Sequence, residues 1–555
     1  MRILPAALAA VVALATLALQ PSSPGADSGV KVLFDFGDGT YLWTEIDVGP
    51  NRTAFNVTVR ASDELGLNLT YQWSSLGVMV QDIGDRHPSY PLWWHLFQWT
   101  DSGSKWESSQ HGAAELNLSA GDAIAWFLAM DNPDTLINTR PVPSPVHPYP
   151  YTSFRKDISN SGSYSGSLCS DHSLRWYFDT HAFEISGTPT AAYGKLFVPT
   201  WEGFYILDIE EGAMVRGKTD ISGMSSPTLF NGGVLIGGKD GYLRDIDISN
   251  GTEVWSVRLI PSPIFTGIAS SPKQYRDRVY VGLFNESGGV GGVVSINVWN
   301  GAIVWKHDSP SIHLSTPAIH NDTLYIGVAG YFNGSSYSFD PPYGLLAMNI
   351  SDGSERWFMP TAGSVASSPV VVDSLIFFTS RDGMVHAVRL NGTEAWTYEI
   401  GNSTSSPTTD GLRLFVADGV MGQKGNVIAL SMIGHKLWET TLSGPVQSSL
   451  LYADGAVFAT TNEAYGTLYV LDANSGDPLW TYMPLPADYT ISSPIVADGV
   501  VYMASDNGFV YALGCPSEAG NEGPSALTYA AFVFVPLVVV AVIGCAFYLV
   551  RRREH

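Results

Sequence analysis

The chain has little cysteine and little positive charge. Its 3 cysteines among 555 residues exclude the dense disulfide framework of a small secreted domain. Its 29 lysines and arginines stand against 52 aspartates and glutamates, which gives a formal net charge of −23 at pH 7. Because this negative field repels phosphate backbones, we expect no nucleic-acid partner. The length exceeds that of one ordinary hydrophobic core, so we expect more than one structural unit.

Helical periodicity is absent from the repeated part of the chain, residues 173–514, which argues against a helical solenoid. Charged residues make up only 15% of the sequence, whereas aromatic residues reach 12% and 56 residues are glycine. This mixture is typical of many short strands joined by tight turns. The composition therefore predicts an all-β dominated fold.

An apolar run lies near the beginning of the chain. Met1–Arg2 precedes the run Ile3–Leu19, and a stretch rich in proline, serine and glycine comes next. This order predicts a secretory signal peptide over residues 1–26, with an uncleaved anchor as the alternative. We therefore expect the rest of the chain to be exported.

A second apolar run, Leu527–Val550, is long enough to cross a bilayer and is followed by "RRREH". We expect a transmembrane helix at 527–550, a stalk at 516–526 and a cytoplasmic basic tail at 551–555, because arginines stay on the inner side. A buried core helix is the alternative. The two runs together predict a single-pass protein of the cell membrane whose N-terminal part lies outside the cell.

Asn-x-Ser/Thr sequons support an external location. All of them lie between the two apolar runs, most of them in predicted turns where a glycan can be tolerated. An acidic, lysine-poor composition with many sequons is typical of an archaeal surface protein. The candidate glycosylation sites are Asn51, Asn56, Asn68, Asn117, Asn250, Asn285, Asn321, Asn333, Asn349, Asn391 and Asn402.

A repeat dominates residues 173–514. Each copy begins with a mark of the form (S/T)P and continues with apolar strands separated by glycine-containing turns. A copy therefore predicts four short strands. One such sheet would expose two apolar faces, whereas packing the sheets around an axis buries both, so we expect an eight-bladed β-propeller over residues 169–515. The marks are Pro189, Pro227, Pro272, Pro317, Pro369, Pro407 and Pro494, with Leu450 of "SSLL" in the remaining place.

In six copies a tryptophan follows the last turn at a fixed position, which indicates packing rather than catalysis. Arg216 fills this position in the first copy, and the eighth copy ends after three strands. "SLRWYFDT" (Ser173–Thr180) lies upstream and has the character of the missing strand, so we expect it to close the ring against the last blade. The tryptophans are Trp176, Trp255, Trp305, Trp357, Trp396, Trp438 and Trp480.

The cysteines fit this closure. Cys169 precedes the closing strand, and Cys515 follows the third strand of the eighth copy. An ordinary blade joins these two points by a short turn, so we expect a disulfide between them in an oxidising compartment. Two unpaired thiols are the alternative. Cys545 lies within the second apolar run and is expected to be a small apolar residue only.

The pattern "SSP–strand–DG–VY–strand–DG–VYAL–turn–G–x–x–x–W" resembles the pyrroloquinoline-quinone (PQQ) repeat, and "FRKDISNSGSYSG" (Phe154–Gly166) resembles the lead-in to such propellers. The resemblance implies one of two classes. Quinoprotein dehydrogenases hold PQQ and a calcium ion at the propeller axis. A scaffold class, similar to the eight-bladed lipoprotein of the bacterial outer-membrane assembly machine, binds proteins and no cofactor.

The sequence departs from the dehydrogenase class. No two cysteines are adjacent, so the vicinal disulfide of that class is missing, and no residues can be assigned to its calcium ligands or catalytic aspartate. Asp240, Asp382 and Asp506 are interpreted as turn residues. We therefore predict no catalytic, cofactor-binding or metal-binding residues, and a non-enzymatic, membrane-anchored binding or scaffold protein of the cell surface. A membrane-anchored PQQ-dependent oxidoreductase, with PQQ and calcium, is the alternative.

Residues 30–130 lack the repeat and are predicted to be strand-rich, with a short helix near Ala61–Gly66. A double tryptophan followed by "SAGDAIAW" resembles the β-grasp domain related to the C-terminal part of transcobalamin. That resemblance implies a carrier or sensor of a small ligand as a further alternative. The aromatic residues of this domain form either a ligand surface or a core with one exposed ring. Residues 131–168 are expected to form a proline- and serine-rich linker and the propeller lead-in.

Three insertions lengthen the loops between second and third strands, at Phe284–Gly292, Ala329–Gly344 and Asp418–Asn426. In a propeller these loops share a face with the connections between blades. Loops on a rigid scaffold commonly carry binding sites, so we expect this face to meet a protein or glycan of the cell envelope. Self-packed loops, with Asn333 glycosylated, are the alternative. The candidate contact residues are Tyr331, Phe332, Tyr337, Phe339 and Tyr343.

Overall fold

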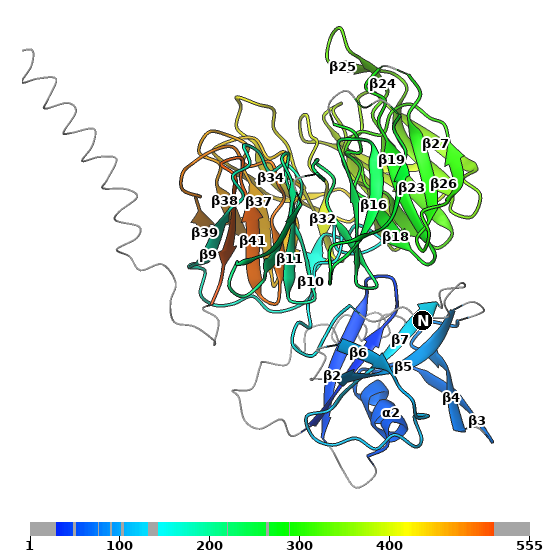
Figure 1. Cartoon of the computed structure of the whole chain (residues 1–555). Coiled ribbons are helices and arrows are strands. Elements are labelled where there is room, and N and C mark those ends of the chain that lie inside the picture. Colours follow the sequence, from blue (N-terminus) through cyan, green and yellow to red (C-terminus); the bar gives the residue numbers. More distant parts are fainter. Residues whose placement is uncertain are drawn as a thin grey trace, which may run out of the picture.

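The structure is a computed structural model in which a small N-terminal domain lies beneath a ring of sheets (Figure 1). It describes residues 29–47, 52–75, 77–88, 92–100, 105–130, 142–218, 220–261, 263, 266–287 and 289–515. Some of the predictions concern segments outside these residues: the signal peptide at 1–26, the stalk at 516–526, the transmembrane helix at 527–550, the tail at 551–555, Asn51 and Cys545.

The structure corrects the predicted localisation. Within the described ranges, no helix is long and apolar enough to cross a membrane. The α-helix found there, α2 (Ala54–Glu64), has 11 residues. At about 1.5 Å per residue it reaches only about half of the ~30 Å hydrocarbon core. The prediction of a single-pass protein of the cell membrane is therefore wrong.

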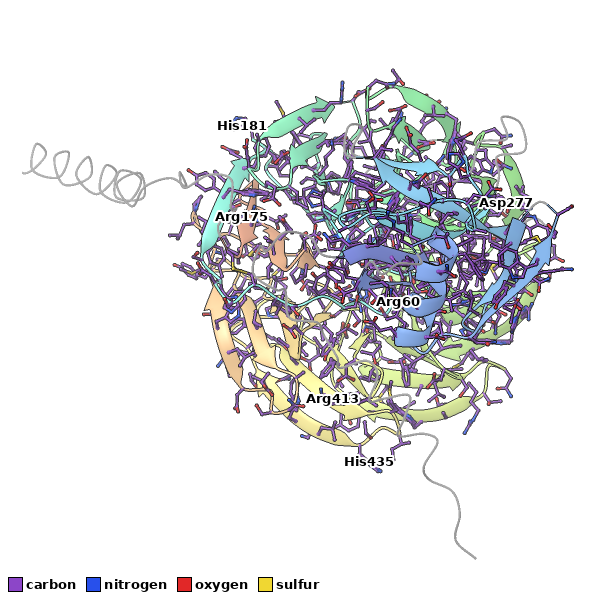
Figure 2. The ribbon with its side chains drawn as sticks, turned by 90° about the horizontal axis from the view of Figure 1, so that it is seen from below. Arg60, Arg175, His181, Asp277, Arg413 and His435 are labelled. Carbon is purple, nitrogen blue, oxygen red and sulfur yellow. A yellow bond between two sulfur atoms is a disulfide. The ribbon has the colours of Figure 1, made fainter. Side chains whose placement is uncertain are left out.

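Eight antiparallel sheets form the ring, and each is one blade of a β-propeller. Seen from below, the blades follow one another around the axis in chain order (Figure 2). Blades one to four comprise β10 (Thr190–Ala192), β11 (Lys195–Pro199), β12 (Phe204–Asp208) and β13 (Met214–Lys218); β14 (Thr228–Phe230), β15 (Gly233–Gly237), β16 (Tyr242–Asp247) and β17 (Glu253–Arg258); β18 (Lys273–Tyr275), β19 (Arg278–Leu283), β20 (Gly292–Asn297) and β21 (Ile303–His307); and β22 (Ala318–His320), β23 (Thr323–Val328), β26 (Tyr343–Asn349) and β27 (Glu355–Thr361).

Blades five to eight have the same order of strands from the axis outward. They comprise β28 (Val370–Val372), β29 (Leu375–Thr379), β30 (Met384–Arg389) and β31 (Glu394–Glu399); β32 (Thr408–Thr409), β33 (Arg413–Ala417), β34 (Asn426–Ser431) and β35 (Lys436–Thr441); β36 (Leu451–Ala453), β37 (Ala456–Thr460), β38 (Leu468–Asp472) and β39 (Pro478–Tyr482); and β40 (Ile495–Ala497), β41 (Val500–Ala504), β42 (Phe509–Leu513) and β9 (Leu174–Asp179). The first strands of neighbouring blades lie side by side around the axis.

The (S/T)P mark joins each blade to the next through hydrogen bonds. The backbone N–H of Ser226 donates to the hydroxyl of Ser271 at 3.0 Å, and the equivalent bond recurs at six other junctions. At the junction of blades three and four, the hydroxyl of Ser270 donates to the carbonyl of Ser315 at 2.8 Å. We call this ring of bonds the hydroxyl belt. Because the hydroxyls are buried, each bond satisfies a backbone group that water cannot reach.

The repeat tryptophans pack between blades. Trp255 donates its indole N–H to the carbonyl of Val298 in the last turn of the next blade, at 2.9 Å. Gly301, in the same turn, has a φ of 73°, and a Cβ there would lie 2.6 Å from the indole ring. Glycine is therefore required both by the left-handed backbone and by the ring that covers it. Trp176, Trp305, Trp357, Trp396 and Trp438 make the same hydrogen bond.

The ring closes through β9, which carries Trp176 and pairs antiparallel with β42. Cys169 and Cys515 are joined by a disulfide at this point, with their Cα atoms 5.7 Å apart. The glycine turn that would cover Trp480 is missing here. His172 takes its place, with its ring stacked on Trp480 at 4.5 Å and 14°. The pairing of β9 with β42, the disulfide and the stacking of His172 on Trp480 therefore replace the turn that joins the third and fourth strands of the other blades.

The N-terminal domain has a five-stranded sheet in the order β2-β1-β7-β5-β6, in which β1 and β7 are parallel. A separate hairpin of β3 and β4 adjoins it, and α2 packs on one face of the sheet. The strands are β1 (Gly29–Asp35), β2 (Tyr41–Asp47), β3 (Leu69–Ser74), β4 (Gly77–Ile83), β5 (Leu92–Thr100), β6 (Lys105–Ser108) and β7 (Ala123–Met130). The resemblance to the β-grasp domain stays a prediction.

The expected helix near Ala61–Gly66 is misplaced, because α2 begins at Ala54. The β-branched residues of "NVTV" favour a strand, but Thr53 caps the helix by accepting the N–H of Asn56. Phe55, Thr58 and Ser62 then recur at helical spacing and are buried against the sheet. Tertiary packing and the cap therefore override the local β propensity.

One buried carboxyl predicts a pH-dependent stability. Asp245 on β16 lies directly opposite Trp255, where other blades carry Ser295 or Ala387. Its buried Oδ1 has no hydrogen-bond partner among the described residues. Burial, and secondarily the charge of Asp247, raise the pKa of Asp245 from 3.8 to about 7. The folded state thus binds a proton that the unfolded state has lost, so stability falls as pH rises from about 4 to about 7.

Asp245→Ser should therefore increase the free energy of unfolding more at pH 8 than at pH 5, by roughly 1.4 kcal/mol for each pH unit inside that window. Urea denaturation at the two pH values measures this difference. Ala387→Ser, which places the same serine at the matched position of blade five, is the control and should have equal effects at both values. An equal gain from Asp245→Ser at pH 5 and pH 8 contradicts the assignment.

The closure predicts a second stability effect. The disulfide links residues separated by 346 positions, so the double variant Cys169→Ser and Cys515→Ser should lose up to ~5 kcal/mol of unfolding free energy. The β9–β42 pairing should keep the variant folded. A reductant should lower the denaturation midpoint of the wild-type chain and leave that of the variant unchanged. If the reductant leaves the wild-type midpoint unchanged, the bond does not stabilise the ring.

Candidate functional site

The candidate binding surface is the propeller face formed by the loops between second and third strands and by the connections between blades. We call it the insertion face. Its most prominent feature is the hairpin of β24 (Tyr331–Asn333) and β25 (Ser338–Asp340), which rises from blade four on the side opposite the N-terminal domain (Figure 1). The hairpin lies between β23 and β26 and belongs to no blade sheet.

The five aromatic residues predicted to contact a partner divide into two groups. Phe332 and Phe339 pack against each other and against Phe284 of the first insertion, with centroid distances of 5.3 to 5.7 Å. Tyr343 donates its hydroxyl to the carbonyl of Phe339. These three residues therefore hold the hairpin against the blades, as the alternative of self-packed loops predicts for them.

Tyr331 and Tyr337 remain exposed, with exposed fractions of 38% and 86%. Tyr337 lies in the turn of the hairpin, and Tyr331 lies at its base, opposite Asp340. Tyr337 has a φ of 49°, which is a left-handed backbone, and its ring lies 6.3 Å from that of Phe332. An exposed tyrosine on an ordered hairpin offers contact area at a low entropic cost. Of the five aromatic residues predicted to contact a partner, Tyr331 and Tyr337 are therefore the two that are exposed enough to do so.

His313 supports the hairpin from the connection between blades three and four. Its ring lies 4.9 Å from Phe284 and 5.3 Å from Phe339. Burial lowers the pKa of His313 from 6.5 to about 4, so the imidazole is neutral at physiological pH. No sequence pattern singles out this residue, because its contacts join segments that are distant along the chain.

Further exposed apolar residues lie on the same face. They belong to connections or insertions of the other blades, and their exposed fractions range from 39% to 69%. A face with several such side chains is typical of a protein-interaction surface. They are Phe183, Met421, Tyr465, Leu485 and Tyr489.

The sequon asparagines lie on both faces of the propeller and on the N-terminal domain. None of the ten within the described ranges is buried. Asn285, Asn333 and Asn402 lie on the insertion face, whereas Asn321 lies in the turn between the first two strands of blade four. Glycosylation stays a prediction.

The opposite end of the axis is closed by the lead-in segment, residues 147–164, which we call the plug. It was expected to be part of a linker, but it bonds to all eight blades. The partners, in the order of blades one to eight, are Ala191, Leu229, Lys273, Ile319, Val371, Thr408, Tyr452 and Asp498. Within the plug, β8 (Ser163–Tyr164) adds a parallel strand to β36.

Buried polar side chains anchor the plug. Asn160 is fully buried and donates to the carbonyls of Thr316 and Pro369, at 3.1 and 3.0 Å. The guanidinium of Arg155 donates to carbonyls of blades six and seven. Lys273 donates to the carbonyl of Asp157 at 2.7 Å, and burial lowers the pKa of this lysine to about 7. Each charged group is thus bonded to backbone oxygens that the axis would otherwise leave unpaired.

These residues do not fit the calcium ion that the quinoprotein resemblance implies for the axis. Arg155 and Lys273 place cationic groups at this end, and like charges repel strongly where water is excluded. In the described part of the chain, no group of three or more His, Cys, Asp or Glu side chains could hold a metal ion. No step of a quinone reaction can therefore be assigned to named residues.

Comparison with known proteins gives one family match. Residues 291–405 and 381–515 match the family described as outer membrane protein assembly factor BamB. The protein of that name from Moranella endobia is 25% identical over 205 residues, which cover 33% of this chain and 50% of that protein. The one from Shewanella oneidensis is 22% identical over 353 residues, which cover 58% and 82%. The chain thus spans half the length of the first relative.

Solved structures are also similar to this chain in their fold. The quinohemoprotein alcohol dehydrogenase from Comamonas testosteroni superposes with a TM-score of 0.56 at 12% identity, over 68% of this chain and 82% of that one. At this identity the likeness concerns the fold alone. The sequence matches, the fold match and the eight four-stranded blades together show that the chain carries PQQ-like repeats folded as a β-propeller.

Proposed function

We propose that this protein is a non-enzymatic binding scaffold that presents the insertion face of its propeller to a protein partner. The observation that carries the proposal is the exposed pair Tyr331 and Tyr337, held on an ordered hairpin opposite the N-terminal domain. The two relatives compared above are named for a role in assembly, whereas two other matches, a tetrathionate hydrolase and a polyvinylalcohol dehydrogenase, are named for reactions. The name of the first two supports a scaffold, and the partner is proposed only by its class.

The insertion face suits a protein partner for physical reasons. The blades beneath it are joined by the hydroxyl belt, so its loops stand on a rigid base. Phe332 and Phe339 order the hairpin before any partner arrives, which lowers the entropic cost of binding. Tyrosine also supplies both an apolar ring and a hydrogen-bonding hydroxyl at an interface.

Replacing both exposed tyrosines tests the proposal. Tyr331→Ser with Tyr337→Ser should lower partner recovery by roughly tenfold or more, because a tyrosine that is a hot spot of an interface contributes about 2 kcal/mol or more. The measurement is affinity capture from extracts of the protein's own cells, quantified by mass spectrometry. The hairpin should stay folded, because Phe284, Phe332 and Phe339 remain packed against one another in this variant.

The matched control removes two apolar side chains from the other face. Leu412 and Ile433 are 61% and 70% exposed and lie in turns on the side of the plug, so Leu412→Ser with Ile433→Ser should leave capture unchanged. An equal loss of partner recovery in both double variants would mean that the capture measures nonspecific hydrophobic binding. Unchanged capture by the tyrosine variant would reject the hairpin as the contact site. A bound quinone chromophore with turnover of an alcohol would favour the oxidoreductase alternative instead.

A further inference from the structure

A cavity of about 420 Å³ lies between the N-terminal domain and the propeller. Its wall combines the β1–β2 loop, the plug, and the turns between the first two strands of blades two and three. Figure 1 shows this junction beneath the ring. The volume is in the range of small-molecule sites, about 300–1,000 Å³, and such sites are common at domain junctions. The cavity lies on the opposite side from the insertion face, so a ligand site there is independent of the proposed scaffold function.

Lys156 of the plug lines this cavity and carries a buried ammonium group. The residue is 9% exposed, and its Nζ donates to the hydroxyl of Ser165 at 3.3 Å. Nζ also lies 5.8 and 5.9 Å from the ring centroids of Tyr41 and Tyr164. None of the described carboxylates lies within ion-pair distance of Nζ. The charge of Asp157 raises the pKa of Lys156, but burial lowers it by more. A lysine is rarely buried without an anionic partner, so the missing partner points to a ligand.

Tyr41 supplies a second unsatisfied group beside the first. It also lines the cavity, and its hydroxyl oxygen is buried without a hydrogen-bond partner among the described residues. Leaving a buried hydroxyl unpaired is costly. An ammonium and a hydroxyl at one end of a cavity are the donors that a carboxylate accepts.

The carboxyl groups already in the wall do not exclude an anion. Asp38 is neutralised by Arg86, with 2.8 Å between Oδ2 and Nη2. Burial raises the pKa of Asp35 to about 7, so this carboxyl is partly protonated near neutral pH and can itself donate a hydrogen bond. The remaining acid, Asp85, points to solvent, with 90% of its side chain exposed.

The rest of the wall combines apolar side chains with the polar side chains of Asn231, Gln274 and Arg276. Phe36 and Phe127 come from the N-terminal domain, Val142 from the linker, and Leu229 and Phe230 from the turn of blade two. Aromatic and aliphatic walls favour an apolar body of similar shape by excluding water from it. The polar end of the cavity favours a carboxylate, and the apolar side chains favour an apolar body attached to it.

We propose that this cavity binds a small monocarboxylate with an apolar, ring-containing body. Lys156 and Tyr41 hold the carboxylate, and the walls from the two domains enclose the ring. A phosphate fits less well, because a dianion requires several cationic donors. Arg86 is already paired with Asp38. Arg276 is exposed and lies over the ring of Tyr275, which leaves Lys156 as the buried cationic donor. Since the wall comes from both domains, the ligand also joins the N-terminal domain to the propeller.

Isothermal titration calorimetry with 2-naphthoate tests this site on the full chain at pH 7. 2-Naphthalenemethanol has the same rings without the charge and is the matched probe. We expect saturable binding of the acid, at least tenfold weaker binding of the alcohol, and no competition by inorganic phosphate. Equal affinity for acid and alcohol, or no saturable binding of either, would overturn the proposal.

Three variants locate the site. Lys156→Met should weaken 2-naphthoate binding at least tenfold and Tyr41→Phe severalfold, whereas Lys436→Met, an exposed lysine of blade six, should leave it unchanged. Circular dichroism checks that each variant is folded. If Lys156→Met does not fold, the proposed site is still tested by Tyr41→Phe and by the comparison of the acid with the alcohol on the wild-type chain. Unchanged affinity in Tyr41→Phe, or in a folded Lys156→Met, would contradict the assignment.

Discussion

Hydrogen bonds from a backbone N–H of one blade to a hydroxyl of the next are the constraint on which the ring depends. They run through the serine or threonine of each mark, at distances of 2.8 to 3.3 Å. Strand pairing satisfies the backbone inside a blade but leaves the turn into each first strand without a partner. Because this turn is buried beside the axis, an unpaired group there would be costly, and the hydroxyl of the neighbouring blade removes that cost. This explains why serine or threonine stands before the proline, or before Leu450, in every copy.

The plug extends the same principle to the axis itself. Backbone groups of the first strands face the centre of the ring, where no further blade can pair with them. The plug supplies carbonyls, and Asn160 and Arg155 supply donors, so that all eight blades are bonded to one segment. Trp43 and Trp106 of the N-terminal domain donate to the carbonyls of Pro148 in the plug and Pro143 before it. The cavity at the junction is therefore bounded by rigid elements on both sides.

The propeller-type fold could be predicted because a PQQ-like copy is one supersecondary unit, and its marks recur at regular intervals. The strand around Trp176 could be assigned to the last blade for the same reason, and the structure pairs it with β42. The plug could not be predicted, since its bonds join positions up to several hundred residues apart and follow no period. Lys273 was the available signal, because it stands where other copies carry a small or apolar residue.

The candidate site was predicted only in part. The sequence located the insertion in blade four, but residue type alone cannot separate Tyr337, which is exposed, from Phe339, which packs on Phe284. Such a difference arises from contacts between insertions of two blades. Lys156 and Tyr41 lie in different domains, so their proximity also emerges only in the folded chain. The helix α2 was placed too late because its cap and its buried face outweigh the β-branched residues within it.

Native-state hydrogen exchange tests most directly whether the belt unites the blades. The decisive amide protons are those of Thr188, Ser226, Thr316, Ser368, Ser406, Ser449 and Ser493, which donate across seven junctions. If the belt holds the ring as one cooperative unit, these protons exchange with similar opening free energies, close to that of global unfolding. Rapid exchange at some junctions while others stay protected would show that blades open separately and would contradict this account.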